Sequence, residues 1–154
     1  MHKTFYASGF LYHLPSQQIL LRQGNKEIAQ GSSVFWSFIG GHSKAKEDEI
    51  KTFERVIKEL LGIKLDSKRI FSVYDYFHTT LKTNHFVVYA EIADAKLFKP
   101  SKDHSFSWFS QKQISKLPFA EQTKHDMIVA QRVINKKSRD IEEKLHPKPV
   151  FTQT

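Results

Sequence analysis

Residues 38–65 read FIGGHSKAKEDEIKTFERVIKELLGIKL, and this stretch decides the fold. A short apolar run ends at the glycine pair 40–41, which permits a tight turn or the close approach of a ligand to the backbone. We expect a helix to begin near Glu47, where acidic side chains complement the helix dipole, and to end at Leu61. Gly62 then stands where a left-handed cap is needed. The predicted order is strand, glycine turn, charged loop, helix and glycine stop.

The side chains of this helix divide into two rows. Apolar residues recur at spacings of three and four and mark the expected buried stripe: Ile50, Phe53, Ile57, Leu60 and Leu61. Lys51, Arg55 and Glu59 follow at four-residue spacing and form one polar row. The periodicity by itself predicts an amphipathic helix with a solvent-exposed row of charged side chains.

The spacing of the charged residues resembles the Nudix box, the signature of the Nudix hydrolases. In that pattern a glycine is followed by five residues, Glu, seven residues, and then Arg-Glu-aliphatic-any-Glu-Glu-any-Gly-aliphatic. Seven of the nine specified positions match: Gly41, Glu47, Arg55, Ile57, Glu59, Gly62 and Ile63. Val56 and Leu60 depart from the pattern, because both stand where the family has glutamates that normally bind metal.

The expected order of elements also follows this family. In chain order we expect strands at 4–12, 18–22, 34–39, 69–78, 85–92 and 107–110, a polar loop at 24–33, a short helix at 114–118, and a long helix from 121 to about 145 that is interrupted or exposed at 136–139. The resemblance implies an α/β (α+β) chain with the Nudix fold, a mixed β-sheet sandwiched between helices. We expect residues 1–136 to form the Nudix domain and residues 137–154 a C-terminal helix extension and tail.

Composition narrows the class of protein. At 154 residues the chain is most simply one domain, and the absence of Cys excludes disulfides and cysteine zinc sites. Lys and Arg number 24 against 16 Asp and Glu, and the net charge of +8 favours anionic ligands such as nucleotides or RNA. No run approaches the roughly 18 apolar residues of a membrane span, so we expect no membrane partner and a cytoplasmic location.

The resemblance implies a specific chemistry, the hydrolysis of a nucleoside diphosphate-linked substrate by water attacking phosphorus with Mg²⁺ or Mn²⁺ bound. Glu59 is then the remaining metal glutamate, helped by the backbone carbonyl of Gly41. Arg55 orients the glutamates, and Glu47 holds the loop to the helix through a salt bridge with Arg55. These three charged residues are the predicted catalytic set.

The predicted substrate contacts lie at the glycine pair and on the strand before it. Arg22 is the last residue of the second expected strand, where family members often place a basic residue against a substrate phosphate. The alternative is that Arg22 is only an exposed charge on an edge strand. Gly40, Gly41 and His42 complete the substrate-binding set, since some Nudix boxes also carry His after the glycines.

Two functions stay open at this stage. With Glu59 the last box glutamate at a metal position, we expect weak metal binding unless carboxylates such as Asp75, Glu91 or Asp103 come in from loops. Only Asp103 or His104 could replace the Glu that many family members carry before the Trp108 strand. The first function is a metal-dependent hydrolase with impaired activity. The alternative is an inactive Nudix-fold protein that binds nucleotide or RNA, which the basic charge and aromatic residues favour. Dimers are frequent in the family, so the oligomeric state stays open between a monomer and a homodimer.

Overall fold

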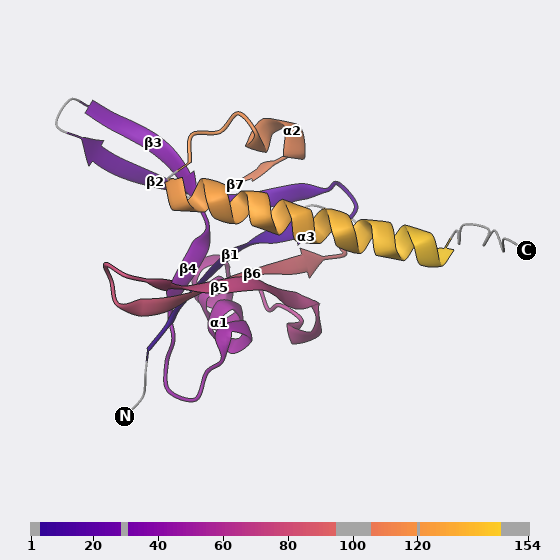
Figure 1. Cartoon of the computed structure of the whole chain (residues 1–154), viewed down its shortest axis with the longest axis horizontal. Helices are drawn as coiled ribbons and strands as arrows, with labels where there is room; N and C mark the ends of the chain where they lie inside the picture. Colours follow the sequence, from indigo (N-terminus) through magenta and orange to yellow (C-terminus); the bar gives the residue numbers. More distant parts are fainter. Residues whose placement is uncertain (1–3, 29–30, 95–105, 120, 146–154) are drawn as a thin grey trace, which may run out of the picture.

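The computed structural model describes residues 4–28, 31–94, 106–119 and 121–145 (Figure 1). The elements in chain order are β1 (Tyr6–His13), β2 (Gln18–Ile28), β3 (Gly31–Ser37), β4 (Ile39–His42), α1 (Glu49–Leu61), the 3-10 helix η1 (Ser67–Arg69), β5 (Ile70–His78), β6 (Thr83–Ile92), β7 (Phe106–Phe109), α2 (Gln111–Ile114) and α3 (Glu121–Leu145). Within these ranges no helix combines the length and the apolar character that crossing a membrane requires.

The described strands form one mixed sheet. Its main path runs β3-β2-β1-β6-β5, while β4 pairs with β1 and β7 pairs with β2. The pairing of β1 with β6 is parallel, from Tyr6 opposite His85 to His13 opposite Ile92, and the other pairings are antiparallel. The mixed sheet that the sequence predicts is confirmed.

Each face of this sheet carries its own apolar core. Successive residues of a strand point to opposite faces. On one face, alternate strand residues such as Leu11, Leu20 and Val88 pack with Phe53 and Ile57 of α1. On the other face, the cluster consists of Phe10, Tyr12, Ile19, Leu21, Phe38, Val87, Tyr89, Ile114, Met127, Ala130 and Ile134. Helices therefore cover both faces, with α3 lying across the strands in Figure 1, as the expected sandwich requires.

The strands before α1 differ from the expected ones. The polar loop predicted at 24–33 is wrong, because β2 and β3 form one long hairpin whose register runs from Arg22 opposite Ser37 to Ile28 opposite Gly31. Backbone hydrogen bonds make this ladder, so residue polarity does not reveal it. The single strand expected at 34–39 is divided at Phe38, since β3 pairs with β2 whereas β4 pairs with β1.

The helix boundaries follow capping groups. The first residue of α1 is Glu49 and not Glu47, because Oδ1 of Asp48 accepts the backbone N–H of Lys51 at 2.8 Å and caps the helix. At the other end Gly62 has φ 70° and donates its N–H to the Lys58 carbonyl, which confirms the expected left-handed cap.

The glycine pair forms no tight turn. Gly40 and Gly41 lie within β4, opposite Ser8 and Ala7 of β1. A Cβ at position 40 would come within 2.9 Å of the Tyr6 hydroxyl, and a Cβ at position 41 within 2.8 Å of Cγ2 of Val56. The two glycines are thus needed because side chains of β1 and α1 approach the strand closely.

The buried face of α1 contains some, but not all, of the residues that the sequence predicts. Phe53 and Ile57 are fully buried as predicted, but Leu60 is 42% exposed. Thr52 and Val56 are buried in its place. A buried Thr is tolerated here because its hydroxyl donates to Glu47 at 3.2 Å, a polar contact that a hydrophobic pattern does not register.

The C-terminal helix is continuous. Residues 136–139 do not interrupt it, because α3 runs unbroken from Glu121 to Leu145, but the alternative expectation is confirmed in that residues 136, 138 and 139 are exposed. Lys137 holds it to the sheet: its Nζ lies 3.2 Å from Oε1 of Glu91 and 3.2 Å from the ring centroid of Phe71. The division of the chain after residue 136 falls inside this helix and stays a prediction.

Lys137→Ala should lower the free energy of unfolding by about 1 kcal/mol, because it removes a half-buried ion pair and a cation–π contact together. The matched control is Lys136→Ala, which truncates the exposed neighbour on the same helix. Urea denaturation followed by circular dichroism measures both. Equal midpoints for the two variants would show that the Lys137 contacts contribute nothing.

Candidate functional site

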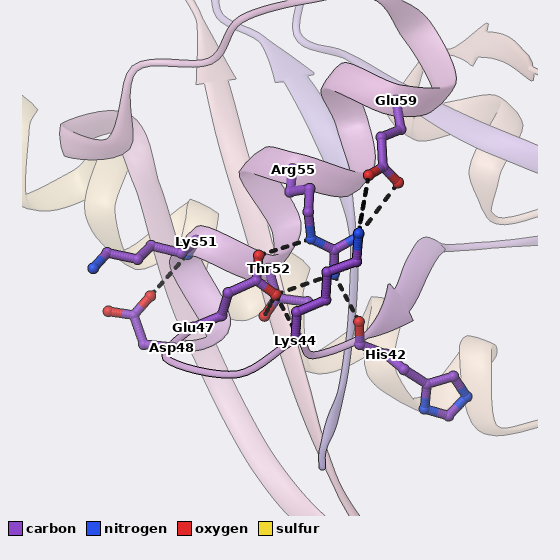
Figure 2. Close-up of polar contacts among 8 residues, drawn as sticks. All are labelled: His42, Lys44, Glu47, Asp48, Lys51, Thr52, Arg55 and Glu59. Carbon is purple, nitrogen blue, oxygen red and sulfur yellow. Dashed lines mark hydrogen bonds and ion pairs between the residues drawn. The ribbon is translucent and has the colours of Figure 1, made fainter. Parts of the chain in front are cut away.

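The guanidinium of Arg55 joins three parts of the chain (Figure 2). Its Nε donates to Oε2 of Glu47 at 2.7 Å, and its Nη2 donates to Oε1 of Glu47 at 3.1 Å. Nη2 also donates to the carbonyl oxygen of His42 at 2.8 Å. This paired geometry is the strong form of an Arg–carboxylate contact. It fastens the loop and the end of β4 to α1.

Glu47 is fully engaged by its neighbours. Besides Arg55, its Oε1 accepts the backbone N–H of Lys44 at 2.7 Å and the hydroxyl of Thr52 at 3.2 Å. The Arg55 hydrogen bond is the largest influence lowering the pKa of Glu47, to about 2, and the same contact raises the pKa of Arg55. The carboxylate therefore stays charged and suits the fastening role expected of it. Its place in the predicted catalytic set stays a prediction.

Glu59, the predicted metal glutamate, lies between two cations. Its Oε2 accepts from Nη1 of Arg55 at 3.3 Å, and its Oε1 lies 3.8 Å from Nζ of Lys44. The side chain is 55% exposed. Both cations offset the negative charge that a divalent ion would need, so the carboxylate attracts such an ion less than an unpaired glutamate would.

The residues around Glu59 do not fit a magnesium site. Mg²⁺ prefers several oxygen ligands in an octahedron. Val56 is 5% exposed and packs on Gly41, and Leu60 offers only carbon. In the part of the chain that the structure describes, no group of three or more His, Asp or Glu is placed to hold a metal ion. Of the carboxylates expected to come in from loops, Asp75 and Glu91 lie instead in strands β5 and β6, and Glu91 pairs with Lys137. Asp103, like His104, lies outside the described residues.

A pocket of about 230 Å³ lies between the sheet and the first turns of α3. Its walls include Tyr6, Ser8, Tyr76, His85, Gln122 and Asp126. The volume is below the roughly 300–1,000 Å³ of sites that enclose whole drug-sized ligands. A single ring system with a small substituent suits it better.

The pocket adjoins the predicted substrate contacts. The rings of Tyr6 and His42 meet edge-on with centroids 5.1 Å apart, and the Tyr6 hydroxyl lies against Gly40. Burial raises the pKa of Tyr6, and the positive charge of Arg22 opposes that rise, which places Arg22 within electrostatic range of the hydroxyl. The structure thus brings Arg22, Gly40 and His42 together around Tyr6. Their contact with substrate stays a prediction.

One wall of the pocket is built from histidine and tyrosine rings. The His85 ring lies 5.0 Å from those of Tyr6 and His78 and 5.3 Å from that of Tyr76, measured between centroids. The Tyr76 hydroxyl and Nδ1 of His85 are 3.3 Å apart, whereas Nε2 is buried without a partner among the described residues. Burial is the main cause that lowers the pKa of His85, so the wall carries a neutral imidazole at neutral pH.

The opposite wall contains a buried carboxylate that the sequence pattern does not identify. Asp126 is 4% exposed, and its Oδ1 accepts from the Tyr74 hydroxyl and from Nε2 of Gln122. The apolar Ile128 of the same helix is 43% exposed, so hydrophobicity alone does not mark the inner face of α3. Residues 126, 130 and 134 are four apart, so helical spacing from the buried Ala130 and Ile134 would have placed Asp126 on the inner face.

Glu47→Gln should flatten the acid branch of the stability curve. Because the pKa of Glu47 falls from its ordinary 4.5 to about 2 on folding, its contribution is complete above pH 4.5 and is lost as the pH falls toward 2. The wild type should therefore lose more free energy of unfolding between pH 5 and pH 3 than the variant does. Urea denaturation at each pH measures the difference.

Glu54→Gln on the same helix is the control for this titration. It removes an equal charge but none of the Arg55 contacts, so its stability should fall with acid as the wild type's does. A wild-type slope in the Glu47→Gln protein would contradict the assignment of the low pKa.

No protein-family model and no curated protein sequence matches the chain. Solved structures do match its fold. A mutT/nudix family protein from Listeria innocua superposes with a TM-score of 0.68 at 15% identity, covering 89% of this chain and 97% of that one. The C-terminal domain of mouse MUTYH, solved in complex with human PCNA, gives 0.64 at 12% identity, with coverage of 87% and 91%.

A third similar structure holds a ligand. The NUDIX domain of Shewanella oneidensis NrtR, complexed with ADP ribose, superposes with a TM-score of 0.61 at 14% identity and covers 87% of this chain and 90% of that one. These likenesses confirm that the chain has the Nudix fold, a mixed sheet with helices. At such identities they extend to the fold alone.

Proposed function

We propose that this chain uses the Nudix fold to bind a nucleotide-type ligand, and that it binds this ligand far better than it hydrolyses it. One observation carries the proposal: Glu59 is paired with Arg55 and Lys44, while Val56 fills the space against Gly41. The place where the Nudix pattern has three metal glutamates therefore presents one ion-paired carboxylate and two apolar side chains.

Binding is supported by features outside the box. The pocket between the sheet and α3 has aromatic walls, and Arg22 lies within electrostatic range of its Tyr6 wall. The net charge of +8 attracts phosphates from a distance. The NrtR domain of the same fold was solved with ADP ribose, which makes nucleoside diphosphates the first ligands to test.

Turnover needs more than this site offers. Attack of water on a diphosphate requires a polarised phosphorus and an oriented water, tasks that divalent cations usually perform. Arg22, Lys44 and Arg55 supply positive charge that is present before and during any reaction. Interactions of equal strength in both states tighten binding without accelerating the chemical step.

The second candidate is the metal-dependent hydrolase. The observation that favours it is that Arg55 still connects Glu47, Glu59 and the His42 carbonyl in one network. In that function Glu59 and the Gly41 carbonyl would hold Mg²⁺ or Mn²⁺ weakly. The two functions differ in what happens when Glu59 is neutralised.

Titration calorimetry with ADP-ribose and the common nucleoside diphosphates, with and without Mg²⁺ or Mn²⁺, tests the proposal, with product formation followed by chromatography. The wild type should bind at least one ligand with an affinity that metal changes less than threefold. Glu59→Gln should bind equally well, because the carboxylate is already paired with cations. Turnover should stay at the level of a no-protein blank.

A restored double variant, Val56→Glu with Leu60→Glu, provides the positive arm. It should gain metal binding, and its matched control is Val56→Gln with Leu60→Gln, which has the same size without the charges. Thermal melting checks that both fold, since Val56 is buried. Metal-dependent hydrolysis by the wild type that Glu59→Gln abolishes would overturn the proposal and establish the hydrolase. The absence of any ligand binding would also overturn it.

The finer expectations stay predictions. RNA is a further anionic ligand that the basic charge favours, and the homodimer and the cytoplasmic location rest on the resemblance and the sequence. Each has a direct measurement, namely filter binding, light scattering and cell fractionation.

A further inference from the structure

We propose that Asp126 makes this pocket selective for a ring with two adjacent N–H donors on one edge, the edge that guanine presents among the nucleotide bases. The inference rests on the proposed nucleotide-binding function and specifies the base. It is carried by the geometry of one buried carboxylate and by the charges of the pocket around it.

The two oxygens of Asp126 are used unequally. Tyr74 and Gln122 both donate to Oδ1, and within the described residues no donor reaches Oδ2. In the same part of the chain, the only side-chain N or O atom that is sealed from solvent without a partner is Nε2 of His85. Oδ2 is therefore accessible. Because Asp126 is 4% exposed and lines the pocket, that access is from the pocket.

The charges in and around the pocket favour different positions for the base and the phosphates of a nucleotide. Of the described residues that line the pocket, Asp126 is the one with a carboxylate, and none is Lys or Arg. A phosphate entering it would meet a negative group in a partly dehydrated space. Arg22 is not among the lining residues but acts electrostatically on the Tyr6 hydroxyl, which lines the pocket. The base thus belongs beside Asp126 and the phosphates toward Arg22.

The chemistry of a carboxylate then chooses among the bases. A carboxylate oxygen without a donor accepts hydrogen bonds, and Oδ2 can accept from two N–H groups that lie side by side on one ring edge. Guanine offers a ring N–H beside an amino group. Adenine and cytosine place a ring acceptor beside their amino group, and uracil places carbonyls on both sides of its N–H. These three would set a lone pair against Oδ2, a repulsion that lowers their affinity.

Stacking on aromatic rings adds affinity for a base but no specificity among the bases. Tyr6, Tyr76 and His85 provide ring faces in the wall, and every base has a π-face that can use them. Since stacking does not distinguish one base from another, the choice of base depends on the polar edge that faces Asp126. Asp126 is accordingly the residue that determines specificity.

Calorimetry with GDP and ADP measures the selectivity directly. Wild type should bind GDP about tenfold or more tightly than ADP, the discrimination expected of a paired polar contact. Asp126→Asn keeps an Oδ1 acceptor for Tyr74 and Gln122 but replaces Oδ2 with a donor. GDP affinity should then fall about tenfold, while ADP affinity holds or rises, so the preference is lost or reversed.

Tyr74→Phe is the matched control, because it removes a donor to Oδ1 and leaves Oδ2 unchanged. It should retain the preference for GDP. Equal affinities for GDP and ADP in the wild type, or an unchanged ratio in a folded Asp126→Asn protein, would overturn the inference and leave the proposed function standing. If neither nucleotide binds, the proposed function fails first. Where Asp126→Asn does not fold, the wild-type ratio decides, with Asp126→Glu as the second variant.

Discussion

The architecture around the box depends on the guanidinium of Arg55. Three of its nitrogen atoms reach Glu47, Glu59 and the His42 carbonyl, so one side chain on α1 fixes the start of the loop, its end and the strand before it. Without Arg55, Oε2 of the largely buried Glu47 carboxylate would lose its hydrogen-bond donor. Since β4 pairs with β1, the same contact determines how His42 meets Tyr6 and therefore where the pocket begins.

The sequence predicts this part of the molecule well because the interacting residues lie on adjacent segments. Glu47 and Arg55 are eight residues apart, and the amphipathic pattern of α1 is strong. Gly62 ends the helix because its backbone has a φ of 70°, a left-handed conformation that favours glycine. The strand composition of residues 4–12 and 85–92 likewise predicts β1 and β6. These are local signals, and each corresponds to a local physical requirement.

The pocket could not be predicted in the same way. Tyr6 and Asp126 are 120 positions apart, and they come together only because β1 pairs in parallel with β6 and α3 crosses that face of the sheet. A carboxylate within an apolar helical stripe was the available signal, and a hydrophobic pattern discards it. The β2–β3 hairpin was missed for a related reason, since its register resides in backbone hydrogen bonds that composition does not encode.

The packing of Val56 on Gly41 also limits how this chain can change by single substitutions. A glutamate at position 56 alone would place a charge in a 5% exposed site against the strand, and a glutamate at position 60 alone would gain no metal partner from its neighbours. Recovery of both metal glutamates therefore includes one step that places a charge in the buried space against Gly41. Of the two apolar residues, Val56 is thus the one that keeps this end of the helix apolar, because its side chain fills the space that a Cβ on Gly41 would need.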